Sequence, residues 1–169
     1  MSDLNSIICR ITWKRQIALL SSMLLKFSIL VIVYLYFFGF SIRSFIYVYL
    51  FLFLFVFDFL PTILLHIQFL IRTGNDIVIL NRKNRTIEYK SKTDSKHNFD
   101  DITVLEYVAS YGGGSGWYSF GEYRYYKIVF KDESSLIINC LMLEDIKHRL
   151  EPILGKTANK KLKVLPFIQ

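Results

Sequence analysis

The chain has 169 residues, of which 53% are hydrophobic and 17% aromatic, and its 21 basic and 14 acidic residues give a formal charge of +7. This apolar content exceeds that of an ordinary soluble domain, and the positive charge is too evenly divided along the chain to indicate a nucleic-acid partner. Its two cysteines cannot build a disulfide framework and stand in no metal-binding pattern, so we expect neither a metal nor a cofactor.

Two long apolar runs follow residues 1–15, which we expect to be a cytoplasmic N-terminal segment. The runs predict a transmembrane hairpin over residues 16–71, with helices at about 16–40 and 44–71. Each run exceeds the roughly 20 residues that a helix needs to cross a hydrocarbon core of about 30 Å. A cleaved signal peptide is the competing interpretation of the first run, but that run is too long for a signal core and no small-residue cleavage site follows it.

The basic residues predict the orientation of this hairpin, because Lys and Arg are retained on the cytoplasmic side. The turn between the two runs contains only Arg43, whereas basic residues flank both outer ends. These flanking residues are Arg10, Lys14 and Arg15 before the first run, and Arg72, Arg82, Lys83 and Arg85 after the second. We therefore expect a multi-pass protein of the plasma (inner) membrane with both termini in the cytoplasm.

Lys26 and Asp58 are ionisable residues inside the predicted transmembrane helices, where each would cost several kcal/mol if it faced lipid alone. A hairpin folded about Ile42 places them level with each other, which predicts an intramembrane polar pair. The pair either serves a proton or ion path or fixes the register of the helices, unless Lys26 extends to the cytoplasmic interface instead. Pro61 is expected to kink the second helix and to free a carbonyl near residue 57 for a hydroxyl group.

After Arg72 the sequence changes to short alternating runs, which are typical of strands. The predicted strands cover residues 76–80, 85–90, 102–110, 123–130 and 135–140, with a short piece near 96–99. Leu143, Ile146 and Leu150 recur at helical spacing and predict an amphipathic helix over about 142–151 that Pro152 helps to end. The expected fold of residues 74–154 is a mainly-β domain of five to seven antiparallel strands closed by one C-terminal helix.

Three segments in this order resemble the bacterial pleckstrin-homology-like (PH-like) domains. They are Phe99–Ile102 entering a central strand, the hairpin Tyr126–Ile138 and the closing helix Leu143–Leu150. Many members of that family follow a transmembrane hairpin, as here. The resemblance covers about residues 74–154 and implies a non-catalytic binding or scaffolding module. It does not imply phosphoinositide binding, because the basic cluster of the eukaryotic relatives has no matched positions in this chain.

A glycine-rich stretch separates two of the predicted strands. A phosphate-binding loop would continue into Lys-Ser or Lys-Thr and a helix, and a dinucleotide-binding loop would have a different glycine spacing, so we predict a hairpin tip. Its aromatic rings either pack against the strand ends or contact the bilayer interface or a partner. The candidate contact loop is Tyr111, Gly112, Gly113, Gly114, Gly116, Trp117, Tyr118 and Phe120.

Residues 155–169 form a tail that is basic and then apolar. It is either disordered or loosely docked, or else it lies on the anionic inner leaflet. The candidate contacts with anionic lipid are Arg82, Lys83 and Arg85 in the first β-hairpin, and Lys160, Lys161 and Lys163 in the tail.

The sequence brings together no nucleophile with a base, no carboxylate pair and no metal cluster, so we do not expect an enzyme. The favoured function is a membrane-anchored PH-like binding or scaffolding module at the cytoplasmic face. Its expected partners are membrane lipid and either an unidentified protein or a second copy of the chain. The alternative is a small membrane immunity protein that neutralises a toxin acting on the same membrane.

Overall fold

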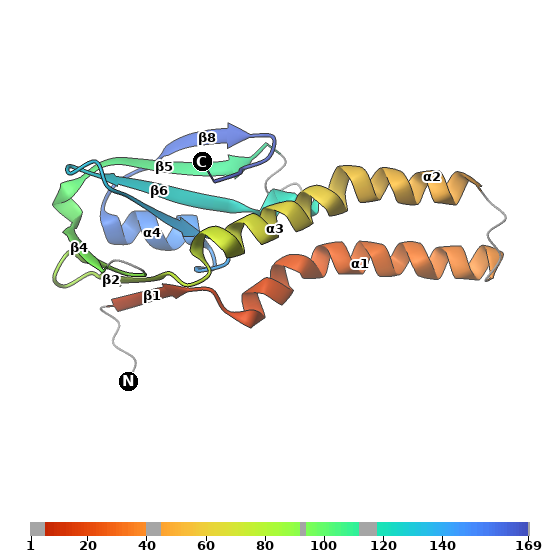
Figure 1. Cartoon of the computed structure of the whole chain (residues 1–169), viewed down its shortest axis with the longest axis horizontal. Helices are drawn as coiled ribbons and strands as arrows, with labels where there is room; N and C mark the ends of the chain where they lie inside the picture. The colour runs from red at the N-terminus through yellow and green to blue at the C-terminus, as the bar shows by residue number, and fades with distance from the viewer. Residues whose placement is uncertain (1–5, 40–44, 92–93, 112–117, 169) are drawn as a thin grey trace.

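Two four-stranded sheets enclose an apolar core (Figure 1). The structure is a computed structural model that describes residues 6–39, 45–91, 94–111 and 118–168. The first sheet has the strand order β1-β2-β3-β4, formed by Ser6–Arg10, Ile77–Asn81, Thr86–Lys90 and Ser95–Asn98. The second has the order β7-β6-β5-β8, formed by Ser135–Asn139, Arg124–Phe130, Ile102–Ser110 and Asn159–Lys163. Two short 3₁₀ turns, η2 (Phe99–Asp101) and η3 (Ser119–Glu122), precede β5 and β6.

The prediction of a mainly-β domain is confirmed, but the described residues contain eight strands where five to seven antiparallel strands were expected, and β5 and β8 pair in parallel. One additional strand is β1, in the segment that was expected only to precede the hairpin. β1 pairs antiparallel with β2, and its Cys9, which lies opposite Val78, is fully buried. The β domain therefore begins before the helical segment, which is inserted between β1 and β2.

The other additional strand is β8, in the tail that was expected to be disordered, loosely docked or spread on the membrane. β8 pairs in parallel with β5. Beyond it, Ile168 is buried, and its main chain exchanges two hydrogen bonds of 3.0 Å with the side chain of Gln68. The described part of the tail is thus a strand and an anchored end, because its main-chain groups find partners in β5 and in the helix that carries Gln68.

The C-terminal helix α4 spans Ile146–Leu154, so it begins and ends later than expected. Asn139 accounts for the late start, because its side-chain oxygen accepts the N–H groups of Leu141 and Met142 and holds this segment in a turn. Pro152 lies inside the last helical turn, and the helix ends at Gly155 with φ +62°. Ile146, Leu150 and Leu154 pack into the core between the sheets.

The inserted segment is a helical hairpin that projects from the β domain (Figure 1). One arm is α1 (Trp13–Phe38), and the other is α2 (Phe45–Leu54), a π-helical turn η1 (Phe55–Phe59) and α3 (Leu60–Thr73). Ring contacts of Phe27 with Phe51 and Phe59 hold the arms side by side. By length and composition, the helix Tyr47–Thr73 is long and apolar enough to cross a membrane. The first arm passes the same test only if its two parts, Trp13–Ser21 and Met23–Phe37, which meet at 44°, are counted as one span.

The α3 helix belongs to the β domain as much as to the hairpin. Its Leu65 and Phe69 are fully buried in a second apolar cluster with Tyr123 and Tyr125. Strand β6 therefore has two buried faces, since its Tyr126 packs in the core between the sheets. The C-terminal half of the predicted second transmembrane helix therefore packs against the β domain.

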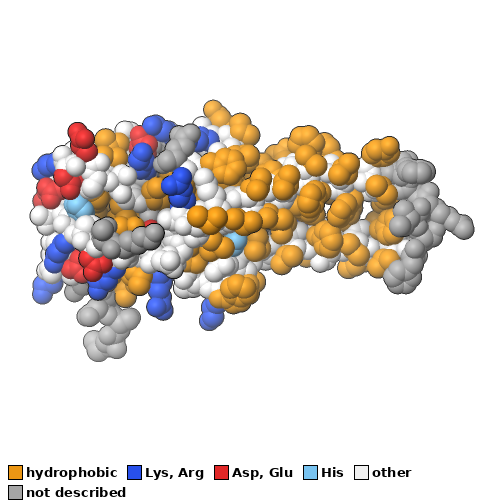
Figure 2. Space-filling model, viewed as in Figure 1, with side chains coloured by type: hydrophobic (Ala, Val, Ile, Leu, Met, Phe, Trp, Pro, Cys, Tyr) orange, Lys and Arg blue, Asp and Glu red, His pale blue; other side chains and the backbone are white. Residues whose placement is uncertain are grey.

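Figure 2 shows how differently the two parts of the molecule are covered. Hydrophobic side chains cover the hairpin, whereas the acidic and most of the basic side chains lie over the β domain. The projecting half of the hairpin therefore presents an apolar surface without a partner in the described part of the chain.

Candidate functional site

The polar centre of the molecule lies where the hairpin meets the β domain. Lys26 Nζ donates to Asp58 Oδ2 at 3.1 Å, so the structure brings together the two residues that the sequence pairs. Ser119 of η3 completes the group: its N–H donates to Asp58 Oδ1 at 2.5 Å and its hydroxyl donates to Oδ2 at 2.9 Å. Lys26 Nζ also lies 3.2 Å from the Ser119 hydroxyl. Three donors therefore hold the Asp58 carboxylate, whose side chain is 5% exposed.

The π-helical turn η1 positions Asp58. At its end, the N–H of Leu60 bonds to the carbonyl of Phe55, five residues back, and the following Pro61 has no N–H to donate. The Thr62 hydroxyl donates to the Asp58 carbonyl at 2.6 Å, one residue beyond the carbonyl that was expected to receive a hydroxyl. A π-helical turn contains about one residue more than an α-helical turn, so it changes which side of the helix faces the β domain. Asp58 is buried on that side.

Beside this group lies a cleft of about 620 Å³ between the hairpin and the β domain, which we call the junction cleft. Its walls are mainly apolar, and the Lys26–Asp58 pair forms part of its lining. The hairpin contributes Lys26, Phe53, Leu54, Val56, Phe57, Asp58 and Pro61, and the domain contributes Ser110, Tyr111, Tyr118, Phe120, Val164 and Leu165. A fixed ion pair under apolar walls suits the binding of an apolar group better than proton transfer, because the carboxylate is already fully engaged.

The ends of the predicted contact loop line this cleft, whereas Gly112, Gly113, Gly114, Gly116 and Trp117 lie outside the described residues. Phe120 is buried and stacks on Tyr118 with the ring centres 5.0 Å apart. Tyr118 and Tyr111 are 49% and 69% exposed. Phe120 therefore packs, whereas contact of the two exposed tyrosines with the bilayer interface or a partner stays a prediction.

The candidate lipid contacts fall into two places. Arg82, Lys83 and Arg85 lie in the turn between β2 and β3, at the end of the domain remote from the hairpin (Figure 1), and Arg85 pairs with Asp100 at 2.8 Å. Lys160, Lys161 and Lys163 lie on β8, where Lys161 pairs with Glu106 at 2.6 Å. A bilayer around the hairpin would lie closer to β8 than to the β2–β3 turn.

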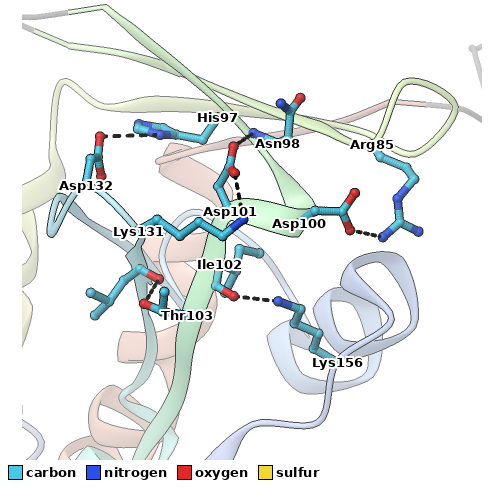
Figure 3. Close-up of polar contacts among 11 residues, drawn as sticks. Arg85, His97, Asn98, Asp100, Asp101, Ile102, Thr103, Lys131, Asp132 and Lys156 are labelled. Carbon is cyan, nitrogen blue, oxygen red and sulfur yellow. Dashed lines mark hydrogen bonds and ion pairs between the residues drawn. The ribbon is translucent and has the colours of Figure 1, made fainter.

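The remote end of the domain is closed by ion pairs and hydrogen bonds (Figure 3). Besides Arg85–Asp100, Lys131 pairs with Asp101 at 3.3 Å, and the Asn98 N–H donates to the Asp101 carboxylate at 3.2 Å. The Asn98 N–H first, and then Lys131, hold the pKa of Asp101 below its usual value.

Asp101→Asn is expected to lower the thermal midpoint of unfolding at neutral pH. In acid, the midpoints of the variant and the wild type should differ less. A carboxyl whose pKa is lower in the folded state stabilises the fold above its unfolded pKa of 3.8, and this contribution is lost as the pH falls below that value. Thermal midpoints of wild type and variant, measured from pH 7 down to about pH 3, test this. The exposed Asp94→Asn is the control, and an equal difference between wild type and Asp101→Asn at every pH would contradict the expectation.

Two other polar contacts join α3 to the domain and were missed in the sequence. His66 has Nδ1 2.8 Å from the Tyr123 hydroxyl. Asn139 donates to the Thr73 hydroxyl at 2.6 Å. Like Ser119, Tyr123 and Asn139 carry no local sequence signal, because their partners lie far away along the chain.

The described residues contain no group of three or more His, Cys, Asp or Glu side chains placed to hold a metal ion. Burial raises the pKa of the Cys140 thiol to about 11, so at neutral pH this group is a thiol and not a reactive thiolate.

Comparison with known proteins matches the chain to a protein family. The sequence model of a family described as PH domain matches residues 9–149, which include the last two residues of β1, the helical hairpin and all later elements as far as the middle of α4. No curated protein and no solved structure matches the chain. The family match covers most of the chain and continues across the hairpin, as expected if the hairpin is an insertion within one domain. The chain belongs to the PH domain family.

Proposed function

We propose that the chain is a membrane-anchored, non-catalytic PH domain that acts as a binding or scaffolding module at the cytoplasmic face of a membrane. PH domains are generally non-catalytic and commonly bind lipids or proteins, which supports the binding role. The anchor is the helical hairpin, and the first and last described elements, β1 and β8, both belong to the β domain.

One observation carries the membrane anchor: the hairpin is apolar and exposed at the same time. Only 22% of an apolar 18-residue stretch of the helix Tyr47–Thr73 is buried, whereas the core helix of a soluble protein would be mostly buried. Soluble monomers rarely expose continuous apolar patches larger than a few hundred Å². The exposed large apolar side chains of the two arms include Leu24, Leu25, Ile29, Ile32, Tyr36, Phe37, Val48, Tyr49, Leu52, Phe53 and Phe57.

The orientation is supported by the basic residues at the base of the hairpin. Lys14 and Arg15 start α1, and Arg72 ends α3, so the cationic end of the hairpin is the end that carries the β domain. This charge distribution supports a cytoplasmic location for the β domain.

Membrane fractionation after expression in a bacterial host tests the anchor. The full chain is expected to stay in the membrane pellet through high-salt and alkaline washes and to be released only by detergent. Recovery in the alkaline wash would contradict a hairpin inserted in the bilayer.

Labelling with a membrane-impermeant maleimide tests the orientation in the same preparation. Lys131→Cys is placed in a background where the buried Cys9 and Cys140 are alanine, because Lys131 is exposed at the remote end of the domain. We expect labelling in inside-out vesicles and none in right-side-out vesicles. The reverse result would place the β domain outside the cytoplasm.

A further inference from the structure

The hairpin is short when it is measured from the junction with the β domain. Beyond the ion pair, the described helical residues are 27–38 of α1 and 45–57 of α2 and η1. At 1.5 Å per residue these segments span about 18 Å and about 20 Å. A hydrocarbon core is about 30 Å thick, so if Phe38 and Phe45 lie at its far edge, Lys26 and Asp58 lie about 10 to 12 Å below the near surface.

The β domain is tied to this same level. Ser119 donates both its N–H and its hydroxyl to the Asp58 carboxylate, so η3 lies beside the pair. At membrane depth, each polar group needs an internal partner, because no water is available. Ser119 and Lys26 supply those partners, and the domain cannot be held away from the bilayer while these contacts exist.

The part of the domain around η3 carries the surface that lipid contact requires. Tyr111, Tyr118 and Val164, which line the junction cleft, are 69%, 49% and 71% exposed. In the described residues after the hairpin, the other exposed large apolar side chains are Val104 and Leu162. Tyrosine is favoured at the level of the headgroups, where its ring lies against acyl chains and its hydroxyl meets water.

The apolar surface of the hairpin also continues past the junction toward the base of the domain. Leu60, Leu64, Ile67 and Ile71 recur along α3 at helical spacing, and all four are exposed on the face opposite the one that packs on the domain. This stripe is continuous with the apolar surface of α2 and η1, which the proposed function places in lipid.

We propose that the rim of the β domain formed by Tyr111, Tyr118 and Val164 is immersed in the lipid interface, with the Lys26–Asp58–Ser119 group below the surface of the hydrocarbon. The occupant of the junction cleft is then the acyl chain of a membrane lipid. This inference rests on the proposed insertion of the hairpin and adds the depth at which the hairpin and the rim lie in the bilayer.

Depth-dependent quenching of tryptophan fluorescence tests the inference. The full chain, with Trp13 and Trp117 replaced by phenylalanine, is reconstituted in phosphatidylcholine–phosphatidylglycerol vesicles that contain lipids brominated near the glycerol end or near the middle of the acyl chains. Single tryptophans are introduced as Tyr118→Trp and Val164→Trp at the rim, Leu52→Trp on the exposed face of α2, and Lys131→Trp at the remote end of the domain.

We expect both rim tryptophans to lose fluorescence, more with the shallow bromine than with the deep one. Leu52→Trp should be quenched more by the deep bromine, and Lys131→Trp should be unaffected by either. Quenching of Leu52→Trp without quenching of the two rim tryptophans would overturn the immersed rim and leave the membrane anchor standing, as would happen if a protein partner or a second copy covered the rim. Loss of quenching at Leu52→Trp as well would overturn the anchor itself.

Discussion

Phe69→Ala is expected to destabilise the chain by about 3 to 4 kcal/mol, which is typical of removing a fully buried aromatic ring. Phe69 is fully buried in α3, and its ring meets Tyr123 and Tyr125 edge-on with ring centres 5.6 Å and 6.1 Å apart. Alanine would leave a cavity between the helix and the second sheet. Chemical or thermal unfolding of the full chain in detergent measures the effect.

Ile71→Ala is the matched control, because Ile71 lies two residues away on the same helix and is 77% exposed. In detergent its effect should stay within about 0.5 kcal/mol. Equal effects of the two substitutions would show that α3 does not pack on the β domain, and the hairpin would then be joined to the domain only through the chain.

Lys26→Leu is the second large effect that we expect, with a loss of roughly 2 kcal/mol in detergent and lower abundance in the membrane. The substitution leaves the buried Asp58 carboxylate without its counter-charge, while both Ser119 hydrogen bonds remain. Thermal midpoints and the amount of chain in the membrane fraction are the two measurements.

Two further variants distinguish the loss of the Lys26 charge beside Asp58 from the effect of placing a leucine in this helix. Lys26→Leu combined with Asp58→Leu should lose less stability than Lys26→Leu alone, because no unpaired charge remains. Lys14→Leu, at an exposed position of the same helix, should leave the thermal midpoint unchanged. A Lys26→Leu midpoint equal to that of Lys14→Leu would mean that the ion pair contributes no stability.

The Lys26–Asp58–Ser119 group also bears on the two interpretations of the pair that the sequence leaves open. Three donors, one from α1 and two from η3, hold the Asp58 carboxylate in one place between the hairpin and the β domain, which favours a structural role for the pair. We therefore regard the group as a joint that fixes the hairpin to the β domain. Under the proposed function, such a joint would fix the distance and orientation of the β domain relative to the bilayer.

Patterns within short stretches of the sequence were sufficient to predict the helices and most of the strands. The length of the apolar runs predicted helices, and the alternation in residues 102–110, 123–130 and 135–140 predicted strands that the structure contains, with ends that differ by one residue at most. The sequence also predicted that Lys26 and Asp58 lie at the same height in the hairpin, because two helices of constant rise per residue are folded about a short link. The match to the PH domain family agrees with this order of elements.

Only the tertiary structure decided which distant segments meet. β1 and β8 are five residues long, and neither alternates clearly, so their assignment depends on partners, β2 and β5, that lie about 70 and 55 residues away. The second buried face of β6 exists because α3 covers it, and alternation within β6 cannot reveal a helix that precedes it by some 50 residues. Ser119 had no signal at all, since a serine in a turn becomes part of an ionic group only when the fold places it beside Asp58. The sequence by itself thus determined the helices, most strands and the paired charges, whereas the insertion of the hairpin into the domain, the docked tail and the joint between them arise from non-local contacts that short-range patterns do not encode.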